Sequence, residues 1–500
     1  MDFNQELNEM GRISMPLCNK IINTDISEDY TLPDYNPEIR RVLYVKETLM
    51  VPAKFINGNK LDINGVIDYT LVYISGDMKL CSIPISSEYA FSITLDNVSD
   101  FEMSEGFTVM AHSICDGSTV RVLSPRKLQI RSHVRSNVNA WGKKACEERI
   151  EGINDPTSIQ RSMQDGICSQ MICENSDVVS LEDEYVLPDE NYRVSLADSS
   201  VNIKECRIDG ELVRINGDAI VKMTIMNEDG NNKETVIRKI PFEAESDVIG
   251  MDIDGGELCR VSGVITDLSL NVIEGKVMTE ANLVLEVCMG QNAKITYTKD
   301  IYSTDQKVKT LVSKEKMPYV VLNKNFNMSQ SDRVGMNEIN FSDESEILDA
   351  CASASVDEMI SENGKFVMRG SCKYNIICQK DGDYSYCEAR VPFKYEGECS
   401  GDIDSFDATV NVMNCKARKD GEYISLDGEL CISCTAMGVE EVEMLDCATF
   451  GEEIEKSKNE WVVCYLQGCE DVWNIAKRHS VRPQDISGDP SKDRFVMIEK

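Results

Sequence analysis

Residues 56–85 read INGNKLDINGVIDYTLVYISGDMKLCSIPI, and this stretch decides the fold predicted for the chain. It opens with a tight-turn signal at Asn57-Gly58, carries a second glycine at Gly65 and turns again at Gly76-Asp77. Apolar and polar side chains alternate between the turns, which is the period of a half-buried strand. The stretch closes on Ile83-Pro84-Ile85. It therefore predicts strands joined by tight turns.

The same plan occurs twice more, at residues 208–242 and 363–393. In the three copies the first two glycines are 7, 7 and 6 residues apart, and the next turn glycine follows 11, 13 and 12 residues later. The second copy closes on Ile240-Pro241-Phe242 and the third on Val391-Pro392-Phe393. Such a period indicates a repeated structural unit. With the strand-like residues that follow, each unit has roughly 110 to 150 residues, the size of a β-sandwich domain.

These repeats set the predicted organisation. The expected fold is mainly β, with three tandem antiparallel β-sandwich-like repeats and a small C-terminal βααβ domain. The first connector is polar and allows a short helix within 157–173, and the second contains the strand-like residues 318–322. The predicted segments are a lead-in (1–29), repeat 1 (30–141), a connector (142–183), repeat 2 (184–305), a connector (306–340), a degenerate repeat 3 (341–458) and the C-terminal domain (459–500).

The net charge of the chain argues against some classes of binding partner. It has 52 basic and 86 acidic residues, a formal net charge of −34, which argues against nucleic acid and anionic lipid as partners. No apolar run approaches membrane-spanning length, so no membrane insertion is expected. Residues 1–30 lack the pattern of a secretory signal, and the 20 cysteines then favour free thiols in a reducing cytoplasm.

No constellation of catalytic or metal-binding residues stands out. The three histidines lie far apart, and the single C-x-x-C pair, Cys431 and Cys434, falls in a strand-like stretch whose positions i and i+3 point to opposite faces. The known nucleotide-binding, hydrolase and zinc-protease signatures do not occur. We therefore expect a protein that is not an enzyme and that needs no cofactor or metal.

One basic stripe interrupts the acidic chain. Residues 121–144 hold seven Lys or Arg and no acidic residue. Three of them, Lys127, Arg131 and Arg135, alternate with apolar residues such as Leu128 and Val134 and so share the polar face of a strand. The stripe is either a solvated strand face or a docking surface for an acidic face of a partner or of a second copy, which would give self-association.

Residues 461–500, here called the tail, differ from the repeats. They carry six basic and six acidic side chains, so the whole net charge lies in the first 460 residues. Residues 472–478 predict a short helix, Val481 to Ile486 can start a second helix with Pro483 in its first turn, and residues 495–498 predict a closing strand.

The tail resembles a LysM module. Residues 466–473 follow the family's Gln-Pro-Gly-Asp-Thr-Leu-Trp phrase without a gap, and Ile475-Ala476-Lys477-Arg478 follows its Ile-Ala-Lys-Arg. The family's Gly-Asp-Thr is Cys469-Glu470-Asp471 here, in the loop that helps LysM modules hold N-acetylglucosamine chains. This departure makes a protein ligand at least as fitting as a glycan. The resemblance implies a core of Trp473, Ile475 and Ala476 and partner or glycan contacts at Gln467, Gly468, Cys469, Glu470, Asp471 and Arg478.

The repeats resemble the SPOCS domain. Residues 32–39, LPDYNPEI, match the phrase near which its copies begin, and residues 65–69, GVIDY, match its Gly-x-x-x-Tyr strand. SPOCS repeats followed by one LysM module are the layout of SipL-like proteins of spore-forming clostridia. That family implies a non-enzymatic scaffold for the spore coat, built at the forespore surface from the mother-cell cytoplasm, whose LysM end recruits the coat's basement-layer ATPase. The alternative is a peptidoglycan- or N-acetylglucosamine-binding protein of the cell wall or cortex.

Overall fold

The chain folds into antiparallel sheets. A computed structural model describes residues 12–95, 98, 107–145, 149–175, 178–189, 191–227, 233–247, 258–455, 461–466, 470–490 and 492–499. Over these residues the chain is 80% strand and 3% helical, which confirms the mainly β fold. No described helix is long and apolar enough to cross a membrane.

The first unit is a sandwich of two sheets. Its buried side chains include Tyr73, Leu128 and Val134, which face one another between the sheets. One sheet has the order β1 (Arg12–Thr31), β7 (Lys127–Ala145), β6 (Phe107–Ser124); in the other, β4 (Lys60–Ser75) pairs with β2 (Ile39–Leu49), β3 (Ala53–Asn57) and β5 (Leu80–Thr94).

The second and third units have the same strand order. In each, a sheet of the first, last and fifth long strands faces a sheet of the second, third and fourth. The second unit has β10 (Val179–Val186), β15 (Lys276–Ser303) and β14 (Leu258–Ile273) against β11 (Tyr192–Asp209), β12 (Leu212–Asn227) and β13 (Lys233–Asp247). The third has β16 (Gln306–Gly335), β21 (Tyr423–Glu453) and β20 (Ser405–Asp420) against β17 (Glu346–Glu362), β18 (Lys365–Lys380) and β19 (Asp383–Glu398).

The first strand of every unit begins before the predicted repeat. Most of β1 lies in the predicted lead-in, β10 begins in the first connector, and β16 fills most of the second connector, 306–340. Each of these strands pairs with the last long strand of its own unit: β1 with β7, β10 with β15, and β16 with β21. The partner lies about a hundred residues downstream, beyond the range of any local sequence signal.

The short helix expected within 157–173 is wrong. A single 3₁₀ turn, η4 (Pro156–Ser158), leads into strand β9 (Ile159–Asn175), and Asp155 caps that turn. Strand β9 pairs along its whole length with β15, from Ile159 opposite Ser303 to Asn175 opposite Glu286. The long-range ladder overrides the weak local preference of this polar segment. A three-residue strand, β8 (Arg149–Glu151), adds a parallel pairing to β21.

The second glycine of each copy, here called the repeat glycine, leaves space for an aromatic ring. Gly65, Gly217 and Gly370 lie opposite Tyr89, Phe242 and Phe393 on the next strand. A Cβ atom would come 2.2 Å from the Tyr89 ring at position 65, 2.7 Å from the Phe242 ring at 217 and 2.4 Å from the Phe393 ring at 370. Each ring therefore lies directly on the bare backbone of the neighbouring strand.

The same pairing corrects the alignment of the first copy. Pro241 and Pro392 pair with the residue just after the repeat glycine, whereas Pro84 pairs with Thr70, five residues after Gly65. The counterpart of Phe242 is thus Tyr89. Ile83-Pro84-Ile85 resembles residues 240–242 and 391–393 in sequence but occupies a different position in the sheet.

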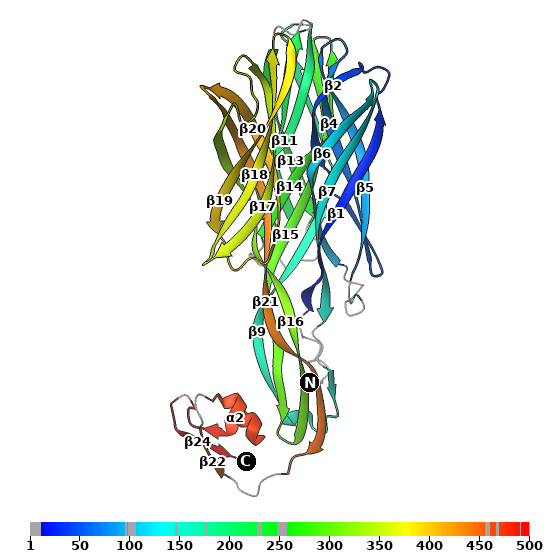
Figure 1. The fold of residues 1–500 in the computed structure, drawn as a ribbon. Coiled ribbons are helices and arrows are strands. Elements are labelled where there is room, and N and C mark those ends of the chain that lie inside the picture. Colours follow the sequence, from blue (N-terminus) through cyan, green and yellow to red (C-terminus); the bar gives the residue numbers. More distant parts are fainter. Residues whose placement is uncertain are drawn as a thin grey trace.

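The three units close into a ring. The positions 24 residues before each repeat glycine are Arg41, Arg193 and Glu346, and each contacts the fourth strand of a different unit. Arg193 donates to the Leu80 carbonyl oxygen of the first unit at 3.2 Å, and Arg41 donates to the Tyr384 carbonyl oxygen of the third. In the third unit the equivalent position is acidic instead of basic. Glu346 pairs there with Lys233 of the second unit at 3.8 Å. Figure 1 shows the resulting bundle of long strands.

Long strands continue from this bundle into a stalk. We define the stalk as β9 together with residues 286–303 of β15, 306–321 of β16 and 437–453 of β21; Figure 1 shows it leading from the bundle towards the tail. Helix α2 and the closing strand are present as predicted. The tail contains β22 (Trp461–Tyr465), α2 (Val472–His479), η5 (Pro483–Asp485), β23 (Ile486–Ser487) and β24 (Phe495–Glu499).

The second helix expected from Val481 to Ile486 is only one 3₁₀ turn. Arg482 is extended, with φ −74° and ψ 148°, because the residue before a proline is disfavoured in the helical region. Ile486 then leaves the turn to pair with Ile498 of β24.

Candidate functional site

The tail builds a small core around its single α-helix. Ile475 and Ala476 of α2 are fully buried against Val496 and Ile498 of β24. Asp471 caps the helix, since its carboxylate accepts a hydrogen bond of 2.7 Å from the backbone N–H of Asn474. The sequence predicted Ile475 and Ala476 as core, and the structure places both there.

The predicted contact residues of the tail have mixed positions. Gln467, Gly468 and Cys469 lie outside the described residues. Arg478 donates to Glu470 Oε1 at 2.6 Å, and Asp471 serves as the helix cap. The three described candidates therefore already have partners within the tail, and any external ligand has to compete with these contacts.

Trp473 joins the tail to the stalk. Its indole Nε1 donates to Asp300 Oδ2 at 2.9 Å, and Lys477 Nζ donates to Asp300 Oδ1 at 2.6 Å. The Trp473 ring also meets the Tyr302 ring edge-on, with centroids 4.9 Å apart, and the Tyr302 hydroxyl donates to the Val481 carbonyl oxygen at 2.7 Å. Trp473, expected in the core of the tail, is half-buried and contacts β15 as well. The tail is thus fastened to the stalk.

One face of the tail's sheet is apolar and exposed. Trp461, Val463 and Tyr465 alternate along β22, and Phe495 and Met497 alternate along β24, with exposed fractions between 41% and 74%. Val463 pairs with Met497 and Tyr465 with Phe495, so the five side chains form one patch, here called the apolar face. The opposite face carries Cys464, Val496 and Ile498, which are buried.

The sequence contained a signal for the apolar face. The strands read WVVCY and FVMIE, and apart from Glu499 both faces of each strand are apolar. A strand with one solvated face normally alternates apolar and polar residues. The missing polar face indicates a surface that is meant to be covered.

Neighbouring strands supply acidic partners to two residues of the basic stripe. Lys127 pairs with Asp29 of β1 at 2.9 Å, and Arg135 pairs with Asp116 of β6 at 3.2 Å. Hydrogen bonds from Lys127 and Gln129 hold the pKa of the Asp29 carboxyl below its usual value. Arg131 is exposed between these pairs. Two of the three predicted docking residues therefore already have acidic partners within the first unit.

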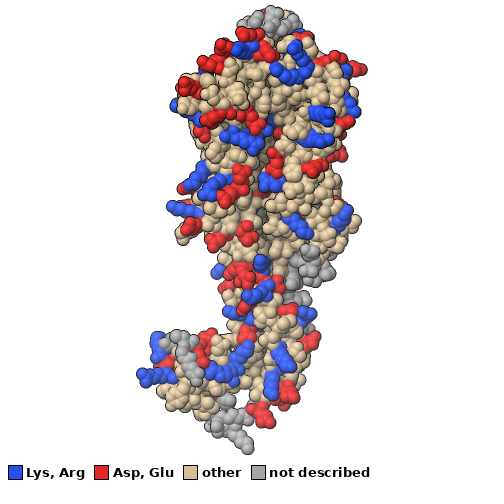
Figure 2. All heavy atoms as spheres, viewed as in Figure 1, with Lys and Arg blue, Asp and Glu red and all other residues tan. Residues whose placement is uncertain are grey.

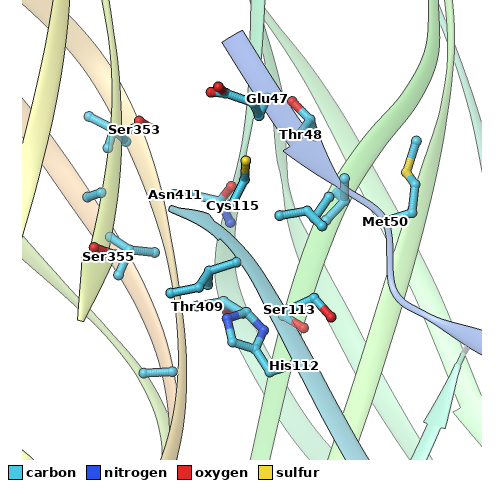
Figure 3. Close-up of a pocket in the computed structure, with 18 of the residues that line it drawn as sticks. Glu47, Thr48, Met50, His112, Ser113, Cys115, Ser353, Ser355, Thr409 and Asn411 are labelled. Carbon is cyan, nitrogen blue, oxygen red and sulfur yellow. The ribbon is translucent and has the colours of Figure 1, made fainter. Parts of the chain in front are cut away.

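A cavity lies where the three units meet. It has a volume of about 350 Å³ and is lined by β2 and β6 of the first unit, β11 and β14 of the second, and β17 and β20 of the third. Its wall is rich in hydroxyl and amide groups, as Figure 3 shows for Thr48, Ser113, Ser353, Thr409 and Asn411.

Ion pairs near this cavity connect the units. Lys46 of the first unit pairs with Asp198 of the second, and Lys222 of the second pairs with Asp349 of the third. Lys46, Asp198 and Cys351 each lie 19 residues before a repeat glycine, so they are equivalent positions of the three units. The equivalent positions carry three different chemical groups.

A second ionic cluster takes one side chain from each unit. Arg260 of the second unit donates to Asp407 Oδ2 of the third at 3.2 Å, and His112 Nδ1 of the first lies 3.8 Å from Asp407 Oδ1. Burial alone would raise the pKa of the Asp407 carboxyl, but the charges of His112 and Arg260 outweigh it and hold that pKa below the usual value. Within the described ranges, no group of three or more His, Cys, Asp or Glu is placed to hold a metal ion.

Comparison of the chain with protein-family models, with curated proteins and with solved structures finds no match. Function therefore has to be argued from the geometry. The strongest feature is the apolar face, which the stalk holds at the far end of the molecule from the body of the three units (Figure 1).

Proposed function

We propose that the chain is a non-enzymatic scaffold for spore-coat assembly. It acts in the mother-cell cytoplasm at the forespore surface, and its LysM-like tail binds a coat protein of the basement layer. The observation that carries the protein-binding part of this proposal is the apolar face of Trp461, Val463, Tyr465, Phe495 and Met497, and the spore-coat setting is what the resemblance to SipL-like proteins implies.

The tail has the surface chemistry of a protein-binding module. Aromatic residues and Met are enriched at the centre of protein interfaces, and they supply most of the apolar face. Figure 2 shows Lys and Arg at the outer end of the tail and again on its side next to the stalk, with Asp and Glu also present, and a charged rim around an apolar centre is usual for a protein interface. The closed ring of three units supports the scaffold part of the proposal, since it gives the stalk a rigid base.

The test compares two single substitutions in the full chain. Val463→Glu puts a charge in the centre of the apolar face, and Leu311→Glu puts the same charge at an equally exposed apolar position on the stalk. Fluorescent fusions of the wild type and of Leu311→Glu are expected to encircle the forespore in sporulating cells. The Val463→Glu fusion is expected to spread through the mother cell.

Two results would contradict the proposal. One is forespore localisation of the Val463→Glu fusion that equals the wild type. The other is strong retention of the purified chain on chitin or peptidoglycan, which would favour the glycan-binding alternative. Circular dichroism of each variant checks that the fold is retained.

A further inference from the structure

Two thiols lie in contact between the two sheets of the second unit. Cys206 is on β11 and Cys259 is on β14, and their sulfur atoms are 2.7 Å apart. Neither takes part in a disulfide bond in the structure. Both residues are partly exposed, and exposed thiols are oxidised more readily than buried ones.

A bond between these sulfurs requires only a small movement. A disulfide S–S bond is about 2.05 Å long, so the atoms need to approach by about 0.65 Å. Cys206 pairs with Ile215 in one sheet, and Cys259 pairs with Met289 in the other. The bond would therefore join two sheets that are otherwise held to each other mainly by side-chain packing.

We propose that Cys206 and Cys259 form an intramolecular disulfide bond when the chain meets hydrogen peroxide, and that this bond staples the second unit. The inference rests on the geometry of that unit and is independent of the tail and of its proposed role.

The chemistry needs one peroxide molecule for each disulfide. One of the two sulfurs, after losing its proton, attacks a peroxide oxygen; the O–O bond breaks, leaving a sulfenic acid on that cysteine and a hydroxide ion that takes up the released proton. The second sulfur then attacks the first, and the hydroxyl group leaves as water with the proton of the second thiol. Two thiols and one peroxide thus give one disulfide and two waters.

The contact also changes the ionisation of one of the two thiols. The hydrogen bond with Cys206, together with burial, raises the pKa of the Cys259 thiol. The thiols of Cys378 and Cys387 of the third unit also interact, but both residues are buried, with exposed fractions of 1% and 6%. They are a natural internal control.

The direct test maps disulfides in the wild-type chain. The full protein is treated with hydrogen peroxide, quenched and alkylated under denaturing conditions, digested without reduction and analysed by mass spectrometry. The expected product is a linked pair of peptides containing Cys206 and Cys259, lighter by two hydrogen atoms than their sum. It should form while Cys378 and Cys387 are still alkylated. Alkylation of both Cys206 and Cys259, their linkage to other cysteines or their conversion to sulfinic acid would each overturn the proposal.

A second measurement tests whether the disulfide bond stabilises the second unit. The melting midpoint of the oxidised wild type is expected to exceed that of the reduced protein, and dithiothreitol should reverse the difference. Cys206→Ser and Cys259→Ser should each abolish it. Equal midpoints of the oxidised and reduced wild type would overturn the stapling role, and this comparison does not depend on whether either variant folds.

Discussion

The Trp473 indole of the tail donates a hydrogen bond of 2.9 Å to the Asp300 carboxylate of the stalk. Lys477 binds the same carboxylate, and Tyr302, two residues along β15, packs on the Trp473 ring. These four residues make the tail part of one body with the stalk. They lie between segments about 170 residues apart in sequence.

Asp300→Ala should loosen the tail. The substitution leaves the Trp473 N–H and the Lys477 ammonium without their shared acceptor, which costs about 0.5–1.5 kcal/mol for each lost hydrogen bond, because both groups are partly exposed to water. Amide hydrogen exchange of α2 is expected to speed up by roughly tenfold or more, since about 1.4 kcal/mol corresponds to tenfold. Asp165→Ala is the matched control, because Asp165 accepts only an exposed hydrogen bond from Thr296 on the same stalk. An unchanged exchange rate in α2 after Asp300→Ala would show that the contacts of Asp300 with Trp473 and Lys477 do not stabilise the docked tail.

Gly65→Ala should destabilise the first unit. The new Cβ would come 2.2 Å from the Tyr89 ring, and overpacking of this kind costs about 1–3 kcal/mol. Gly76→Ala is the control, because no atom lies within 4 Å of its Cβ position. Urea denaturation should show a lower midpoint for Gly65→Ala alone. Adding Tyr89→Ala to Gly65→Ala should cost less than the sum of the two single changes, and strict additivity would rule out the ring contact as the cause.

Asp407→Asn should destabilise the contact between the three units at the buried cluster of Arg260, Asp407 and His112. Breaking a buried ion pair by changing one partner costs about 3–5 kcal/mol, and the Arg260 and Asp407 side chains are only 2% and 7% exposed. The Asp407 pKa is lowered in the folded state, so its contribution is complete above the unfolded pKa of about 3.9 and is lost as the pH falls through the lower folded value.

The difference in unfolding free energy between wild type and Asp407→Asn should therefore shrink as the pH falls below about 4. Asp420→Asn on the same strand removes only an exposed pair with Arg333 and should change stability by less than about 0.5 kcal/mol at any of these pH values. A gap that stays constant down to pH 2 would contradict the charge interaction.

Lys222 and Asp349 should behave as a coupled pair between the second and third units. Both side chains are 13% exposed, and Asp349 also accepts a hydrogen bond of 3.1 Å from Thr224. Lys222→Met and Asp349→Leu are each expected to cost several kcal/mol, because the remaining charge is stranded, about 3–5 kcal/mol by analogy with other buried pairs. The double variant should be more stable than either single one. Additive losses in denaturant titrations would show that the two charges do not interact.

The sequence predicted those parts of the fold that local patterns specify. The turn glycines Gly58, Gly210 and Gly364, the alternation of Leu128 and Val134 and the helical spacing of Ile475 and Ala476 correspond to observed elements. Gly230 lies outside the described residues. Most of the first strand of each unit was missed, apart from residues 318–322 of β16, because its partner is the last strand of the same unit. The helix within 157–173 was predicted wrongly for the same reason, since only pairing with β15 makes residues 159–175 a strand.

The candidate site could be predicted only in part. Arg131 and its neighbours appeared as a bare cationic stripe because Asp29 and Asp116 come from strands that the sequence does not place beside them. Trp473 was assigned to a core from its helix position, and its second contact, Asp300, is set by how the tail docks. The apolar face could have been predicted, because WVVCY lacks the alternation of polar and apolar residues that a solvated strand shows.

The equivalent positions of Lys46, Asp198 and Cys351 have a consequence for how such a ring can evolve. A trimer of identical chains must place the same residue three times around its centre, and three lysines or three aspartates there would repel one another. Joining the three units in one polypeptide lifts that restriction, because each copy can mutate separately. A cation in one copy can then face an anion in the next, and the order of the units around the centre becomes encoded in their charges.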